Sequence, residues 1–183
     1  SSWIAQRNRP LYLIGSSIGA WRFAALSQSD PAGALERFAA AYTGQTYNEK
    51  PTAREVTQET IRIMDSFLDD GGIREVLNHP FLRLNLLAVY CKGLTSFESK
   101  LVLGASIGTS ALLNMIDRRL LKCFFKRALF YNPKDVPPFG NMNEFPPIKT
   151  PLDENNFRRA LLATGSIPLI MSGVKNIHGA PAG

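Results

Sequence analysis

The chain has 183 residues, of which 45% are hydrophobic and 20% are charged, a composition typical of one globular domain rather than of a disordered or fibrous chain. Its 21 Lys and Arg residues against 15 Asp and Glu residues give a net charge of +6, which suits an anionic surface or substrate as well as an ordinary basic protein. The longest uncharged run, Leu101 to Ile116, is shorter than the roughly 20 residues of a membrane-spanning helix.

Few residues in the chain are suited to bind a metal. Cys91 and Cys123 lie in apolar stretches without the spacing of metal ligands, which favours two buried thiols over a disulfide or a metal site. The chain has two histidines, His79 and His178. The sequence therefore predicts neither a metal nor a cofactor, and we expect no signal peptide ahead of the first strand.

The N-terminal half begins with an apolar strand that runs into a glycine- and serine-containing turn at 15–19. Helices are then predicted over 18–28, 31–42, 52–68 and 73–78. Asp30 is suited to cap the second of these helices, and Pro31 to occupy its first position. We expect the third helix to end at Asp69-Asp70-Gly71-Gly72, where the glycines break it.

The C-terminal half alternates apolar and turn-forming stretches. Its predicted elements are a buried strand at 83–91, a mostly helical stretch at 99–119, a segment at 120–131 that begins as helix and ends as strand, and a helix at 153–163. The density of Pro, Asn and Gly in 132–151 predicts a loop with an extended piece at 146–149. Strands that alternate with helices favour a layered α/β domain.

The turn at 15–19 has the sequence Gly-Ser-Ser-Ile-Gly, between a strand and a helix, which is typical of a nucleophile elbow with Ser17 at its apex. Gly15 and Gly19 have no Cβ, so strand and helix can approach closely while the hydroxyl stays exposed. The first amides of the helix then favour negative charge at that hydroxyl. A second Gly-x-Ser-x-Gly surrounds Ser106, where we favour a buried or lipid-facing helix with close packing.

Two stretches together resemble the patatin-like phospholipases, the bacterial members most. Residues 15–22, Gly-Ser-Ser-Ile-Gly-Ala-Trp-Arg, are similar to that family's serine elbow, and 162–169, Leu-Ala-Thr-Gly-Ser-Ile-Pro-Leu, to the stretch before its catalytic aspartate. Gly173-Val174 and 179–183 resemble the approach to that aspartate. The resemblance implies a three-layer α/β/α fold with a central, mostly parallel sheet. It also implies that a Ser-Asp dyad hydrolyses lipid acyl esters through an acyl-enzyme, without a histidine or a metal.

The chain departs from the family pattern at both ends. The family's glycine-rich oxyanion segment lies before the serine strand, and residues 1–10 contain no such run. The family's catalytic aspartate, in Asp-Gly-Gly or Asp-Gly-Ala, is expected beyond Gly183. We therefore interpret 1–183 as a single patatin-like domain that is incomplete and, without these segments, inactive.

Other acids of the chain offer alternative partners for Ser17. Asp70-Gly71-Gly72 matches the aspartate pattern by its letters, but a helix-ending turn is the favoured interpretation. Ser17, Asp153 and His178 follow the order of nucleophile, acid and histidine in α/β-hydrolases. Asp153 is better suited to cap a helix, however, and His178 lies in a Gly- and Pro-rich loop. His79 precedes Pro80 in a turn and is assigned no chemistry.

Basic residues alternate with large apolar ones in the segment 118–127. The basic residues are Arg118, Arg119, Lys122, Lys126 and Arg127. This pattern suits peripheral contact with an anionic membrane, or the solvated face of an ordinary helix. No nucleic-acid-binding module accompanies it, so we expect no nucleic-acid partner.

The sequence thus predicts a cytoplasmic serine esterase of phospholipase A type that acts on lipid or phospholipid, at the periphery of the membrane. A Ser-Asp-His esterase, an acyltransferase and a non-catalytic membrane-binding protein with the same fold are the alternatives. The head group, the acyl chain and the oligomeric state are not predicted.

Overall fold

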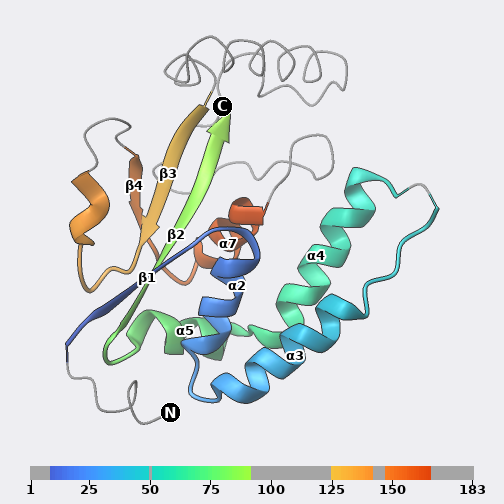
Figure 1. Cartoon of the computed structure of the whole chain (residues 1–183), viewed down its shortest axis with the longest axis horizontal. Coiled ribbons are helices and arrows are strands. Elements are labelled where there is room, and N and C mark those ends of the chain that lie inside the picture. Colours follow the sequence, from blue (N-terminus) through green and yellow to red (C-terminus); the bar gives the residue numbers. More distant parts are fainter. Residues whose placement is uncertain (1–8, 50, 92–124, 142–146, 166–183) are drawn as a thin grey trace.

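The computed structural model describes residues 9–49, 51–91, 125–141 and 147–165 (Figure 1). The strands in this part of the chain are β1 (Leu11–Gly15), β2 (Leu82–Cys91), β3 (Phe125–Tyr131) and β4 (Ile148–Pro151). The helices are α2 (Ser17–Leu26), α3 (Pro31–Thr43), α4 (Ala53–Phe67), α5 (Asp70–Asn78), α7 (Phe157–Gly165) and the 3-10 helix η3 (Pro138–Asn141). The protein is therefore an α/β protein, as predicted.

The four strands form one sheet in the order β1-β2-β3-β4. β1 pairs with β2 in parallel, with Gly15 opposite Leu86, and β3 pairs with β4 in parallel. The central pair, β2 and β3, is antiparallel. Two of the three pairings are thus parallel, which confirms a mostly parallel sheet in the described part of the chain.

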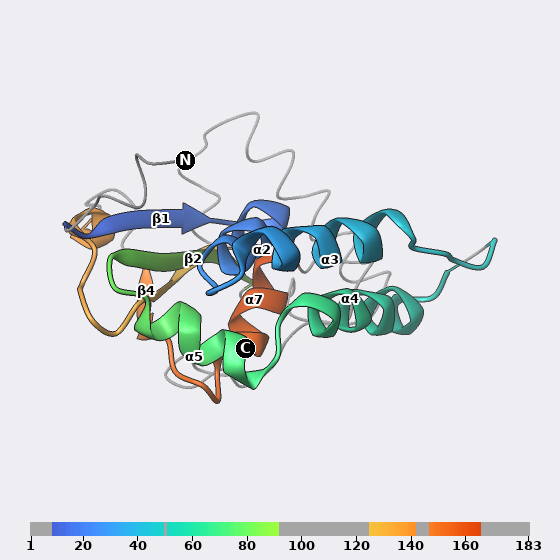
Figure 2. The same cartoon turned by 90° about the horizontal axis from the view of Figure 1, so that it is seen from below.

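The helices α2, α3, α4 and α7 gather on one side of the sheet, and α3 and α4 form a hairpin that projects away from it (Figures 1 and 2). Alternate residues of β2, among them Leu84 and Leu86, point to this side and form the hydrophobic core together with buried residues of α2 and α7. Three rings fill the space between helices: Phe38 and Phe67 lie 5.2 Å apart, and Trp21 lies 6.2 Å and 6.0 Å from them (ring centroids).

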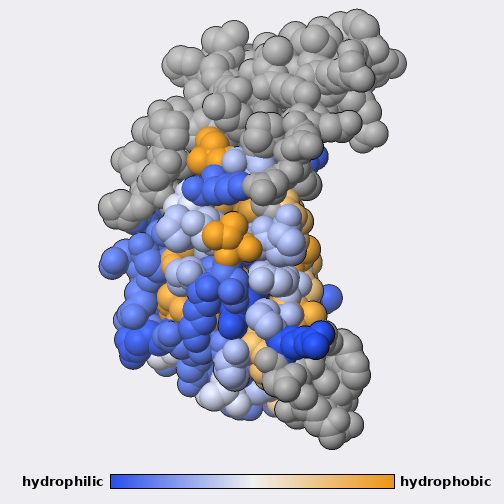
Figure 3. All heavy atoms as spheres, turned by 90° about the vertical axis from the view of Figure 1, so that its left-hand side faces the viewer, coloured by the Kyte–Doolittle hydropathy of each residue, from blue (hydrophilic) through white to orange (hydrophobic). Residues whose placement is uncertain are grey.

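The other face of the sheet is more polar. Arg83 alternates with the core residues of β2 and donates from Nε to Asp135 Oδ2 at 2.7 Å. The fully buried Asn85 donates from Nδ2 to the carbonyl of Leu13 at 3.2 Å, which ties β2 to β1. η3 covers part of this face, where Phe139 meets the ring of Tyr12 edge-on. Figure 3 shows hydrophobic residues on this side as separate islands among hydrophilic ones.

Helix caps explain where the predicted helices begin. The Asp30 carboxylate accepts from the Gly33 amide at 3.0 Å, as expected for the cap of α3. Thr52 likewise accepts from the Glu55 amide at 3.2 Å and caps α4. Among the described residues, no helix is long and apolar enough to cross a membrane.

The third predicted helix ends before 69–72 as expected, because α4 ends at Phe67, but the next helix starts earlier than predicted. The Asp69 carboxylate accepts from the Gly72 amide at 2.7 Å and caps α5, so the glycines lie in the first turn of α5, which starts at Asp70 instead of Ile73. Gly72 is buried, and a Cβ there would lie 2.9 Å from Gln28 Oε1. A Cβ at Gly72 would therefore require the end of the Gln28 side chain to shift.

Two further boundaries differ from the predictions. α7 covers 157–165 rather than 153–163, because a turn held by Asp153 and Asn156 precedes it. Residues 125–131 form a strand, as predicted for the end of the segment 120–131. The expected helical start at 120–124 and the expected helix at 99–119 lie outside the described residues.

Candidate active site

Ser17 occupies the sharp turn between β1 and α2. Its φ is 51°, and it is the one residue other than glycine with a positive φ in the described part of the chain. This left-handed conformation costs a residue with a Cβ about 1–2 kcal/mol. The residue is also exposed, so its hydroxyl is accessible at the N-terminus of α2. A strained, exposed serine at a strand-to-helix turn is the geometry of a nucleophile elbow.

The two glycines of the motif differ in what they contribute. A Cβ on Gly15 would lie 2.6 Å from the Ala20 Cα and 2.8 Å from the Ala20 nitrogen, so β1 and α2 approach too closely for any side chain there. A Cβ on Gly19 would meet none of the described atoms within 4 Å. The packing role expected of both glycines therefore holds for Gly15 and is not needed at Gly19.

The first turn of α2 leaves one backbone amide without an acceptor next to the candidate nucleophile, among the described residues. Ser16 is the N-cap residue, but its side chain does not cap the helix. Its carbonyl accepts from the amides of Gly19 and Ala20, at 3.1 Å and 3.4 Å. The amide of Ile18 has no acceptor among the described residues. The residue after an elbow serine can donate one hydrogen bond to an oxyanion. The sequence pointed to the start of this helix but did not single out Ile18.

The end of α7 lies beside the elbow. The Ser16 hydroxyl reaches the Thr164 carbonyl at 3.5 Å, and the Trp21 indole donates to the Leu161 carbonyl at 3.3 Å. These two contacts show that α2 and α7 pack antiparallel, with the C-terminal end of α7 next to Ser16. The two stretches that resemble patatin-like phospholipases, 15–22 and 162–169, therefore meet in space as far as residue 165, where the described part of α7 ends.

Asp70 lies at the other end of α2 from Ser17. Gln28, just after α2, donates to the Phe67 carbonyl at 3.0 Å and contacts Gly72, so the start of α5 adjoins the C-terminal end of α2. A helix of ten residues is about 15 Å long, which separates Asp70 from Ser17. The Asp70 side chain is 81% exposed and lies 3.6 Å from the Arg158 guanidinium.

Asp153 has the structural role that was favoured for it. Its carboxylate accepts from the Asn156 amide at 2.7 Å, and its own amide donates to Asn156 Oδ1 at 3.0 Å. This reciprocal pair precedes α7, whereas Ser16 adjoins the opposite end of that helix. The nine residues of α7 span about 13 Å, so the geometry does not favour a triad of Ser17 with Asp153.

Several candidate residues lie outside the described residues. These are Ser106 with its second Gly-x-Ser-x-Gly, His178, Cys123, Arg118, Arg119 and Lys122. Of the basic cluster, Lys126 and Arg127 lie on β3, and Arg127 is exposed. Cys91 is the last residue of β2. Within the described ranges, no three His, Cys, Asp or Glu side chains come together as a metal site.

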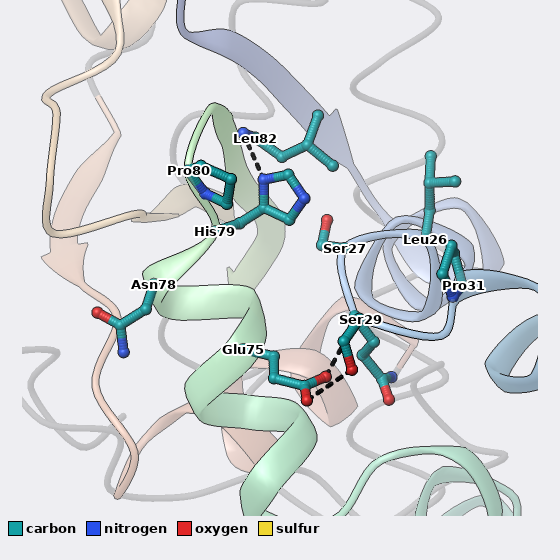
Figure 4. A pocket seen from close by; sticks show the side chains of 10 residues that line it. Leu26, Ser27, Ser29, Pro31, Glu75, Asn78, His79, Pro80 and Leu82 are labelled. Atoms are coloured by element: carbon teal, nitrogen blue, oxygen red, sulfur yellow. Dashed lines mark hydrogen bonds between the residues drawn. The ribbon is translucent and has the colours of Figure 1, made fainter. Parts of the chain in front are cut away.

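A pocket of about 570 Å³ lies at the far end of α2 from Ser17 (Figure 4). The end of α2 and the loop after it line one side, and the end of α5 with the turn at His79 lines the other. The sequence did not predict this pocket, because it joins two stretches, 26–31 and 75–82, that carry no recognisable binding motif. The pocket is separate from the elbow.

Comparisons with protein-family models, with curated proteins and with solved structures found no match for the chain.

Proposed function

We propose that the protein is a serine hydrolase that cleaves carboxylic esters through an acyl-enzyme formed on Ser17. The observation that carries the proposal is the elbow itself: Ser17 is exposed and has a φ of 51°, between a strand and a helix. Backbone strain of this kind persists only where the surrounding structure enforces it, and it concentrates at functional sites. Here Gly15 lies too close to the Ala20 backbone of α2 to carry a Cβ, so β1 and α2 pack directly against each other on either side of the turn.

In the proposed reaction, the Ser17 hydroxyl oxygen attacks the ester carbonyl carbon, and its proton passes to a carboxylate base. The carbonyl oxygen becomes an oxyanion, for which the Ile18 amide and the positive end of α2 are suitable donors. The alkoxide of the substrate leaves with the proton from the base, which completes the acyl-enzyme. Water then attacks the acyl-enzyme, releases the carboxylic acid and restores the Ser17 hydroxyl.

The base is proposed to be an aspartate beyond Gly183, as the resemblance to patatin-like phospholipases implies. Asp70 and Asp153, the acids considered within the chain, each lie about a helix length from Ser17. The position of Thr164 beside Ser16 supports this proposal, because the stretch that resembles the family's approach to its aspartate starts next to the elbow. The complete domain would then have the three-layer α/β/α patatin-like fold.

The proposed substrates are lipid acyl esters, including phospholipids. A cytoplasmic protein at the periphery of an anionic membrane would meet them there, and the basic segment 118–127 is the proposed contact. The net charge of +6 supports this assignment. An alcohol in place of water would turn the same acyl-enzyme into an acyltransferase, so the ratio of hydrolysis to transfer has to be measured.

The test compares Ser17→Ala with Ser16→Ala in the protein encoded by the natural gene. Hydrolysis of a short p-nitrophenyl ester should fall at least about a thousandfold in Ser17→Ala, because the acyl-enzyme cannot form. Ser16→Ala is the matched control, because it removes a neighbouring exposed hydroxyl and retains the nucleophile. Equal turnover by wild type and Ser17→Ala would contradict the proposal. His178→Ala should retain turnover, whereas a loss of several orders of magnitude would favour a histidine-dependent mechanism.

A further inference from the structure

The pocket at the far end of α2 has a chemistry of its own. Its volume, about 570 Å³, lies within the range of small-molecule sites. Its walls combine aliphatic side chains with one acid and one imidazole. Six of the lining residues are Leu26, Ser29, Pro31, Glu75, His79 and Leu82. In Figure 4 their side chains surround the open space between α5 and the loop that follows α2.

His79 is held in one tautomer. Its Nδ1 accepts from the amides of Leu82 at 2.9 Å and Phe81 at 3.3 Å, so that nitrogen carries no proton. The proton of the neutral ring is therefore on Nε2, which points away from this bond towards Ser27 in Figure 4. Burial, followed by the charges of Arg83 and Lys134, lowers the pKa of His79. The ring is thus neutral at pH 7 and does not repel a cation in the pocket.

Glu75 brings a negative charge to the same pocket. Its two oxygens accept from the Ser29 amide at 2.9 Å and from the Ser29 hydroxyl at 2.7 Å, which fixes the carboxylate in place. These hydrogen bonds lower the pKa of Glu75, so the group is ionised at pH 7. Each oxygen keeps a further lone pair. Among the ion pairs of the described residues, none involves Glu75.

We propose that this pocket binds a small organic cation, namely an alkylammonium compound whose apolar body lies against Leu26, Pro31 and Leu82 and whose charged end meets Glu75. The fixed carboxylate supplies the charge that an ammonium group complements. The aliphatic wall supplies the hydrophobic contact that inorganic cations do not use. An alkyl carboxylate, such as a free fatty acid released by an esterase, would instead be repelled by Glu75. The site is therefore independent of the proposed reaction at Ser17.

The probe is n-hexylammonium, added at millimolar concentration to isotopically labelled protein and followed by the NMR shifts of backbone amides. We expect saturable shifts at Ser29, Glu75 and His79. Hexanoate, which has the same chain and the opposite charge, should bind at least about tenfold more weakly, because Glu75 repels it. Shortening the probe to butylammonium should weaken binding by about threefold or more for each methylene lost from contact.

Glu75→Gln is the protein variant that tests the charge. It retains an oxygen that can accept from Ser29, and its thermal unfolding would show whether the fold is kept. Because Glu75 is exposed, its ion pair is worth little, and we expect hexylammonium to bind about three- to fivefold more weakly. Glu36→Gln, an exposed acid of α3 outside the pocket, makes the same change in net charge and should leave the affinity unchanged. The proposal is overturned if hexanoate binds as well as hexylammonium, if the two variants behave alike, or if the shifts fall elsewhere.

Discussion

The strained backbone of Ser17 makes a prediction about stability that is separate from catalysis. At φ 51°, a residue with a Cβ is disfavoured by about 1–2 kcal/mol, and glycine is not. Glycine, in turn, loses more chain entropy on folding, which costs about 0.5–1 kcal/mol relative to alanine. Ser17→Gly should therefore be more stable than Ser17→Ala by about 0.5–1 kcal/mol. Both variants lack the hydroxyl, so the difference reports on the backbone alone.

The assay is equilibrium urea denaturation of the two variants, followed by circular dichroism and by tryptophan fluorescence, to which the buried Trp21 contributes. In a chain of this length, a difference of 1 kcal/mol raises the melting temperature by about 2–4 °C. The control is Ala39→Gly, at an exposed helical position of α3, where glycine should be less stable than alanine by about 1 kcal/mol. If Ser17→Gly is no more stable than Ser17→Ala, Ser17 does not hold the left-handed conformation and the elbow geometry is wrong.

Three further changes test other contacts by the same denaturation assay. Gly15→Ala should destabilise the protein by about 2 kcal/mol, because its Cβ would lie 2.6 Å from a Cα of α2. Gly19→Ala should be neutral or stabilising. Equal losses of stability in the two variants would contradict this. Asp135→Asn should cost about 2 kcal/mol, since it leaves the Arg83 side chain, which is 9% exposed, without its carboxylate. No change would show that the pair contributes nothing. The pKa of His79 is lowered in the folded protein, so the unfolded chain takes up a proton first as the pH falls below 6.5, and the free energy of unfolding should decrease there. In His79→Asn this decrease should be smaller. An identical pH profile in the variant would contradict the role of Nδ1.

The local signals in the sequence predicted the elements well. Asp30 with Pro31 and Thr52 are short-range helix caps, and they act as expected because a cap needs only residues within one turn. The strand, the elbow and α2 follow from the apolar run and Gly15 for the same reason. Short-range chemistry of this kind can be recognised without knowledge of the fold.

Most of the errors arose where a distant segment decides the outcome. The start of α5 at Asp70 instead of Ile73 follows from the local cap by Asp69, which was not recognised, whereas the packing of Gly72 beside Gln28 depends on a distant segment. The antiparallel pairing of β2 with β3 also depends on residues far apart in the chain. Neither the pocket at His79 nor the meeting of Ser16 with Thr164 has a local signature, because each joins segments that are distant in sequence.

The candidate site was predicted in part. Ser17 was found from the motif, and its conformation and exposure agree with the elbow that was expected. The Ile18 amide was not singled out, because every residue but proline has such an amide and only the position at the helix start distinguishes it. The aspartate beyond Gly183 remains a prediction from the resemblance.

The central claim is that Ser17 is a nucleophile, and the most direct test is to locate a covalent adduct. The protein encoded by the natural gene would be treated with a serine-directed fluorophosphonate, digested, and mapped by tandem mass spectrometry. We predict one adduct, on Ser17, in the wild-type protein and none in Ser17→Ala. An adduct on Ser106 or Ser16 in its place, or labelling that persists unchanged in Ser17→Ala, would contradict the claim.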